Sequence, residues 1–306
     1  MDRDVLLLGV DGGGTRCRAR LCAASGERLG EATAGPANIR FGLQQSFAAV
    51  LQAALQCLEQ AGLSQDDLGR IVACLALAGA TEPGHLAAMQ NCEHPFRKAI
   101  ITTDAHAACV GAHDGRDGGV IVVGTGTIGW AELAGRAHRA GGWGLPVSDE
   151  GGGAWLGLEA LRRVLWAQDG RRAWTRLLRA LFEKFQSDPH AIVRFTFEAK
   201  PRDYASLAPL VVEHAAQRDA AAIELMRSAA SHIDALAERL VAFGAERIAL
   251  AGGLALEIEP WLAPKTRRHL VPPAGDALAG ALSLARVAAE APTVPDHPDQ
   301  LVLQLG

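Results

Sequence analysis

The sequence has no C-x-x-C pair and no group of cysteine and histidine at zinc-binding spacing. This excludes the common zinc modules and gives no sign of a disulfide framework. The six cysteines are therefore expected to be reduced thiols, mostly small core residues, as is typical of a cytoplasmic protein.

Long hydrophobic runs are also missing. The longest, Ile71 to Leu77, is far too short to cross a bilayer, and the first apolar run begins after three charged residues and ends at Asp11. Neither a membrane span nor a signal peptide is expected. With 30 basic against 34 acidic residues there is no basic surplus, so a nucleic acid is not an expected partner.

What is present fits a compact globular protein. Of the 306 residues, 49% are apolar and 21% are charged. The length suits two domains of ordinary size, and a cleft between two domains is a usual place for a small-molecule site.

The two halves of the chain repeat the same order of features. Each opens with a buried strand and a turn rich in glycine and threonine, at Asp11–Thr15 and again at Gly124–Thr127. Each then has an apolar strand ending in glycine, and later an aspartate followed by an alanine-rich segment; Asp104 and Asp276 are these aspartates.

This duplication predicts an α/β fold with two lobes around a central cleft. We expect an N-terminal lobe over residues 1–113 and a larger C-terminal lobe over residues 114–306. The extra length of the second lobe carries amphipathic stripes, which predict a helical insertion at about 153–245.

The two glycine-rich tips are candidate phosphate-binding loops. Glycine lets backbone N–H groups approach phosphate oxygens closely, and threonine adds hydroxyl donors. A tight hairpin turn is the alternative for a single tip, but two tips at matching positions favour phosphate. Asp11 ends a buried strand, where a carboxylate needs a cation, so we expect it to bind Mg²⁺ through water. The P-loop motif is absent, which excludes that mechanism.

One motif suggests a different function. Gly124 to Gly129 satisfies G-x-G-x-x-G after a strand, and Asp149 follows 20 residues later, as in a dinucleotide-binding site. Residues 130–139 can be drawn as the helix that such a site requires. This reading leaves the first tip and the repeat without a purpose, so it is not favoured.

At these residues the chain resembles the BadF/BadG/BcrA/BcrD ATPase family of the actin/hexokinase superfamily, and within it the N-acetylglucosamine and glucosamine kinases. The resemblance runs from Leu6 to about Ala289. It rests on the two tips, on Leu77-Ala-Gly79, on Leu250-Ala-Gly-Gly-Leu254, on Thr102-Thr-Asp104, on Gly141-Gly-Trp-Gly144 with Ser148-Asp-Glu-Gly151, and on Pro273 to Ala281. It implies a duplicated actin-like, ribonuclease H-like fold.

The resemblance also implies roles for individual residues. Asp104 is the expected catalytic base. The expected ATP-binding residues are Gly12, Gly13, Gly14, Thr15, Gly124, Thr125, Gly126, Gly252 and Gly253. The expected sugar-binding residues are Asn38, Asp104, Thr127, Trp143, Gly144, Asp149 and Glu150.

Each of these roles has a plainer alternative. Asp104 could be an ordinary helix cap, and Asn38 a turn residue. Asp149 and Glu150 could be solvated loop charges, and Trp143 could pack in the core. Gly252 and Gly253 could simply form a sharp bend. His106 and His138 are interpreted as solvent-exposed or capping residues without a role.

The function expected from the resemblance is an ATP- and Mg²⁺-dependent N-acetylglucosamine kinase that phosphorylates the sugar 6-hydroxyl. Glucosamine kinase is the alternative acceptor choice. An ATPase activator of a dehydratase is the rival within the family, and Cys109 is the one cysteine near the site in sequence. A sensor that binds without catalysis is a third reading. The resemblance also leads us to expect a homodimer.

Overall fold

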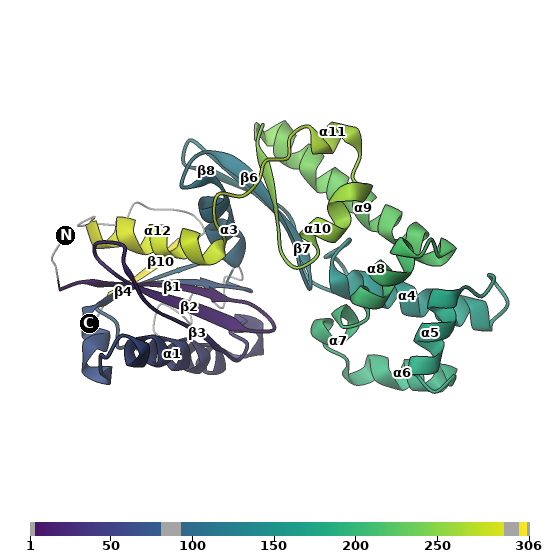
Figure 1. Ribbon diagram of the computed structural model, residues 1–306, viewed down its shortest axis with the longest axis horizontal. Coiled ribbons are helices and arrows are strands. Elements are labelled where there is room, and N and C mark those ends of the chain that lie inside the picture. Colours follow the sequence, from purple (N-terminus) through teal and green to yellow (C-terminus); the bar gives the residue numbers. More distant parts are fainter. Residues whose placement is uncertain (1–3, 81–92, 291–299, 305–306) are drawn as a thin grey trace. The chain divides into compact units, whose positions relative to one another are not determined.

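The computed structural model describes residues 4–80, 93–290 and 300–304 (Figure 1). The chain divides into two compact units. The first comprises residues 1–120, 131–137 and 272–306, and the second residues 121–130 and 138–271. The C-terminal segment is thus grouped with the first unit, and the boundary predicted at residue 113 stays a prediction. Among the described residues, no helix has the length and apolar character that a membrane-spanning helix needs.

The first unit contains a six-stranded mixed sheet with the order β10-β5-β4-β1-β2-β3. Strands β1 and β4 are parallel, as are β4 and β5, whereas β1, β2 and β3 form an antiparallel meander and β10 pairs antiparallel with β5. The strands are β1 (Leu6–Gly12), β2 (Cys17–Ala23), β3 (Arg28–Ala34), β4 (Ile71–Leu77), β5 (Lys98–Thr102) and β10 (Gln300–Gln304).

Burial along these strands follows their position in the sheet. All seven residues of β4 are buried, because helices cover both faces of the sheet at this inner parallel strand. Strand β2 instead begins with strict alternation of buried and half-buried residues, from Cys17 to Leu21, as its sequence predicts.

Helices lie on both faces of this sheet (Figure 1). Helix α1 (Leu43–Gln60) packs on the face that carries Leu6, Leu8 and Val10. Helix α12 (Ala277–Glu290) packs on the opposite face, against Leu7, and α3 (Asp104–His113) lies beside it. The unit also contains the short 3₁₀ helices η1 (Ile39–Phe41) and η2 (Gln65–Arg70).

Helices α3 and α12 cross in close contact because glycine lies at the crossing. A Cβ atom on Gly280 would lie only 1.9 Å from the carbonyl oxygen of Ala107, and one on Gly111 only 2.1 Å from that of Asp276. The close approach places Asp276, just before α12, against Gly111 near the end of α3.

The second sheet has the order β8-β7-β6-β9. Its strands are β6 (Gly118–Val123), β7 (Thr127–Leu133), β8 (Arg136–Gly141) and β9 (Ile248–Ala251). The division between the two compact units falls inside β6, β7 and β8.

The helices of the second unit include the four that the apolar stripes predict. The longest, α9, begins at the Asp219 cap, whose carboxylate accepts the amides of Ala221 and Ala222, and it ends at Gly244 with φ of 117°. The helices are α4 (Gly153–Gln168), α5 (Arg176–Lys184), α6 (Pro189–Glu198), α7 (Pro201–Ala205), α8 (Ala208–Ala216), α9 (Ala220–Phe243), α10 (Ala255–Ile258), η3 (Glu259–Trp261) and α11 (Pro264–Arg267).

The dinucleotide-binding alternative is wrong. The glycine tip at residues 124–126 leads into strand β7, and after a turn at Ala134 and Gly135 the chain continues as β8. No helix follows the G-x-G-x-x-G motif directly, and the bound pyrophosphate of such sites lies at the N-terminus of that helix.

Candidate active site

The first glycine-rich tip lies between β1 and β2, as predicted. The Gly13 amide donates to the Arg16 carbonyl over 2.9 Å, which closes the turn. Gly12 is packed beneath it, since a Cβ there would lie 2.5 Å from the Leu77 side chain. Gly13 and Gly14 are partly exposed and Thr15 is exposed, so the tip presents small residues and a hydroxyl to its surroundings.

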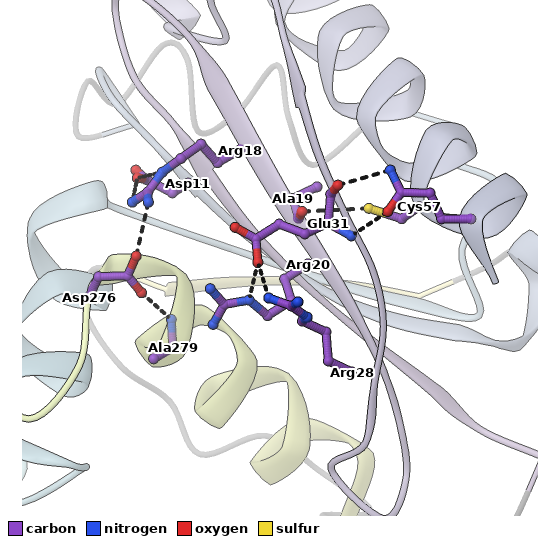
Figure 2. Close-up of polar contacts among 10 residues, drawn as sticks. Asp11, Arg18, Ala19, Arg20, Arg28, Glu31, Cys57, Asp276 and Ala279 are labelled. Carbon is purple, nitrogen blue, oxygen red and sulfur yellow. Dashed lines mark hydrogen bonds and ion pairs between the residues drawn. The ribbon is translucent and has the colours of Figure 1, made fainter.

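Asp11 pairs with Arg18, a residue that the sequence analysis missed (Figure 2). The Arg18 guanidinium donates to Asp11 Oδ2 over 2.8 Å and to Asp276 Oδ2 over 2.9 Å. Asp276 also accepts the Ala279 amide at the start of α12 through its other oxygen. One guanidinium therefore links the first tip to the helix that begins about 260 residues later in the chain.

The pairing of Arg18 with Asp11 and Asp276 shifts pKa values in the direction that favours the charged forms of Arg18 and Asp276. Burial by itself would lower the pKa of Arg18, but the two carboxylates outweigh it and raise that pKa. Burial by itself would raise the pKa of Asp276, and the Ala279 amide together with Arg18 lowers it. The hairpin register could have identified Arg18, because it lies directly opposite Asp11 in the β1–β2 pairing.

The Asp11 carboxylate still suits the predicted role toward Mg²⁺. Both bonds from Arg18 reach Oδ2. Within the described part of the chain no hydrogen bond is formed to Oδ1, and the side chain is 22% exposed. An oxygen is thus left for a water molecule of a hydrated cation.

Asp104 is the first residue of α3, at the junction with β5. Thr103 caps this helix, because its hydroxyl accepts the His106 amide over 3.0 Å. The Asp104 carboxylate accepts the neighbouring Ala105 amide through Oδ1, and the residue is half-buried. Thr103 is the cap, so the interpretation of Asp104 as the helix cap is wrong.

Asn38 acts locally as the turn alternative predicts. Its side chain caps η1 by accepting the Arg40 amide over 3.0 Å. It also lies close to two glycines of the same unit. A Cβ on Gly79 would come within 2.8 Å of its Oδ1, and one on Gly14 within 3.7 Å of its Nδ2. The amide is thus held beside the first tip.

The second tip is anchored on the N-terminus of α4. The amides of Gly153 and Ala154 donate to the carbonyls of Gly124 and Thr125 over 2.8 and 2.9 Å. Thr127, where β7 begins, is 3% exposed, and its hydroxyl has no hydrogen-bond partner among the described residues. A buried hydroxyl without a partner is costly, so this donor is suited to a ligand or a water molecule.

Asp149 lies against this second tip. Its Oδ1 accepts the Gly144 amide over 3.0 Å. A Cβ on Gly126 would lie 2.2 Å from its Oδ2, so glycine is required there. Asp149 itself has φ of 67°, in the left-handed region that non-glycine residues seldom adopt. The structure thus brings a predicted phosphate loop and a predicted sugar loop together within the second unit.

Trp143 is 65% exposed, so the core-packing alternative is wrong for this residue. The Arg139 guanidinium lies over its ring, 4.1 Å from the centroid, and is held by the carbonyls of Gly141 and Gly142. Glu150 is half-buried and accepts the Ser148 hydroxyl. These contacts present an indole ring beside the loop that carries Asp149.

Strand β9 ends at a bend in which the two glycines differ. Gly252 has φ of 94°, and a Cβ there would lie 2.4 Å from the Val123 carbonyl oxygen, so this glycine is required by the bend. Around Gly253 a Cβ would meet nothing within 4 Å. Gly253 is therefore the one with space for a ligand.

The two histidines that were interpreted as solvent-exposed or capping residues are neither. His106 is 2% exposed and is bonded through both ring nitrogens, to Thr102 and to Glu132. His138 is half-buried and stacks on Phe243 with ring centroids 4.8 Å apart.

The cysteines outside the undescribed segments are free and buried, as expected. Cys109 is 1% exposed, and burial raises the pKa of its thiol to about 12. Among the described residues, no three side chains of the metal-binding kinds come together. Cys92 lies outside the described residues.

The predicted site residues form two groups, one in each compact unit. The first unit holds the first tip with Asp11, Asn38 and Asp104, and the second holds the second tip with the Trp143, Asp149 and Gly252 loops. In the first group Asn38 lies beside the tip, and in the second group Asp149 lies against it.

Comparison with known proteins identifies relatives of the whole chain. The sequence model of the BadF/BadG/BcrA/BcrD ATPase family matches residues 8–284. Over 278 residues the chain is 41% identical to glucosamine kinase GspK of Vibrio cholerae, across 91% of this chain and 95% of that protein.

Two solved structures share the fold. A candidate N-acetylglucosamine kinase from Chromobacterium violaceum has a TM-score of 0.87 at 36% identity, covering 92% of this chain and 99% of that one. A ROK family glucokinase from Streptomyces griseus has a TM-score of 0.54 at 18% identity, covering 92% and 99%. The predicted α/β, actin-like ATPase fold is confirmed. The chain belongs to the BadF/BadG/BcrA/BcrD ATPase family.

Proposed function

We propose that this protein is an ATP-dependent amino-sugar kinase that transfers the γ-phosphoryl group of ATP to the sugar 6-hydroxyl. The observation that carries the proposal is Asp104. Its carboxylate stands at a strand-to-helix junction that Thr103 already caps, in the unit that contains the first glycine-rich tip. The 41% identity to a glucosamine kinase over nearly the whole chain supports the same reaction.

Phosphoryl transfer asks mainly for positioning and for neutralisation of charge. The carboxylate of Asp104 would accept the proton of the attacking hydroxyl. The backbone amides of each glycine-rich tip, with the hydroxyl of Thr15 or Thr125, are suited to donate to phosphate oxygens. Gly253, with the bend at Gly252, would leave room for the adenosine.

Mg²⁺ would supply neutralisation of the triphosphate charge when bound. Asp11 would hold it through water, using the oxygen that Arg18 leaves unbonded. Arg18 would meanwhile hold the carboxylate in one orientation through its two bonds to Oδ2.

The sugar would be held mainly by the loop that carries Asp149. Asp149 and Glu150 would accept hydrogen bonds from its hydroxyls, and the exposed face of Trp143 would stack on its apolar side. Asn38, Thr127 and Gly144 complete the proposed sugar-binding residues.

An ADP-release assay with glucosamine, N-acetylglucosamine and glucose tests this function. Glucosamine is the first acceptor to try, since the relative at 41% identity is named for it. We predict that Asp104→Asn lowers kcat by about 10²-fold or more while ATP and sugar still bind, because only the proton acceptor is lost. Near-normal turnover in that variant would exclude Asp104 from the mechanism.

The dehydratase-activator reading makes a different prediction, since it needs iron held by accessible cysteines. The burial of Cys109 argues against it. Iron in the purified protein, together with no sugar-dependent ADP release, would favour the activator. Sugar binding without any turnover would favour the sensor instead.

Location and association belong to the same proposal. The buried free thiols support a reducing compartment such as the cytoplasm. A homodimer is expected from the resemblance alone, and light scattering on the purified protein tests it.

A further inference from the structure

The side chain of His106 is buried and bonded on every side that can bond. Its Nδ1 lies 2.7 Å from Thr102 Oγ1, and its Nε2 lies 3.1 Å from Glu132 Oε2. Its backbone amide donates to the Thr103 hydroxyl over 3.0 Å. His106 therefore contacts both residues that directly precede Asp104.

The two ring bonds hold the imidazole from opposite sides. A carboxylate oxygen accepts, so Nε2 donates to Glu132 on β7. Nδ1 shares the second bond with the Thr102 hydroxyl, at the end of β5. Glu132 and Thr102 thus fix the plane and the position of the ring.

Packing does not explain a histidine at this position. Every residue of α3 after Asp104 is buried, and most are small or apolar. An apolar side chain would fill the same space without the desolvation cost of an imidazole. The bonds of the ring are the feature that an apolar residue would lack.

We propose that His106 is a positioning residue for Asp104. Thr102 ends β5 two residues before Asp104, so the side-chain bond from His106 to Thr102 fixes the strand end from which the Asp104 carboxylate projects. Glu132 fixes the ring in turn. This inference rests on the proposed kinase function, because it assigns Asp104 the role of proton acceptor.

Substitution of Thr102 tests the network with a matched pair of variants. Thr102→Val keeps the shape and removes the hydroxyl, whereas Thr102→Ser keeps the hydroxyl. We expect Thr102→Val to lower kcat by about tenfold with both KM values within about twofold, and Thr102→Ser to restore most of the loss. Equal effects of valine and serine, or a loss confined to KM, would overturn the proposal.

A double-mutant cycle separates positioning from a general structural role. If His106 acts through Asp104, Thr102→Val should cost nothing further in kcat when combined with Asp104→Asn. A full additional loss in the double variant would show that the network acts elsewhere. The variants Glu132→Ala and Glu132→Gln provide a second pair for the same cycle. The Glu132 side chain is 24% exposed, so a substitution there disturbs the core less than one at the buried His106.

Crystal structures of Thr102→Val and Thr102→Ser keep this test independent of the assay. We expect the Asp104 carboxylate to turn in the valine variant and to stay in place in the serine variant. An unmoved carboxylate in both would overturn the positioning role. A wild-type protein without any sugar-dependent ADP release would instead overturn the proposed function, and the crystal structures would still decide the placement of Asp104.

Discussion

Replacing Gly126 by alanine tests the placement of Asp149 against the second tip. The new Cβ would lie 2.2 Å from Asp149 Oδ2 and 2.8 Å from its Cγ. The carboxylate must move by about 1 Å to reach ordinary contact. Its 3.0 Å bond to the Gly144 amide then breaks or weakens. A hydrogen bond to a charged group contributes about 1.5–3 kcal/mol, which corresponds to about 10- to 100-fold in rate or binding.

The assay is ADP release against sugar concentration at saturating ATP. If Asp149 binds the sugar, Gly126→Ala should lower kcat/KM for the sugar by about 10- to 100-fold. The control is the double variant with Asp149→Ala, in which the clash is gone, so Gly126→Ala should add little to the loss from Asp149→Ala alone. A wild-type kcat/KM for Gly126→Ala, or full additivity in the double variant, would refute this reasoning.

Two further predictions concern the first unit. Arg18→Met leaves Asp11 and Asp276 without their shared cation. Folding lowers the pKa of Asp276, so this carboxylate contributes its full stabilisation of the folded protein above its unfolded-state pKa of about 4. That contribution is lost as the pH falls through the lower pKa of the folded state. Urea midpoints should therefore differ between variant and wild type at pH 7 and converge toward pH 2.5, and a constant gap would contradict this. Gly280→Ala forces a Cβ to 1.9 Å from the Ala107 carbonyl, so urea unfolding should show a loss of about 1–3 kcal/mol; an unchanged midpoint would show that the helices separate easily.

Much of the local architecture was predictable because it depends on neighbouring residues. The turn residues and the strand periodicity predicted both glycine-rich tips, and the apolar stripes predicted α1, α4 and α9. The partner of Asp11 could also have been predicted from the sequence, because the hairpin register sets Arg18 opposite Asp11. The short apolar segment of β10 carries no sequence motif, and it lies at the sheet edge because its backbone pairs with β5.

Other features could not be predicted, since they depend on which distant groups meet. Residue type could not show that Trp143 is exposed while Trp130 is 1% exposed. Nor could it show that His106 is bonded to Thr102 and Glu132 inside the core.

The sequence by itself determined the order of elements, the two tips and the family, because backbone preference and hydrophobic period act over a few residues. Only the tertiary structure decided which polar groups share a bond. Asp276 meets Arg18 across 258 residues of chain, and Asp149 lies against Gly126 only because the loop after β8 folds back onto the tip. Such pairings follow from the packing of whole helices and sheets, which places side chains that no local pattern connects.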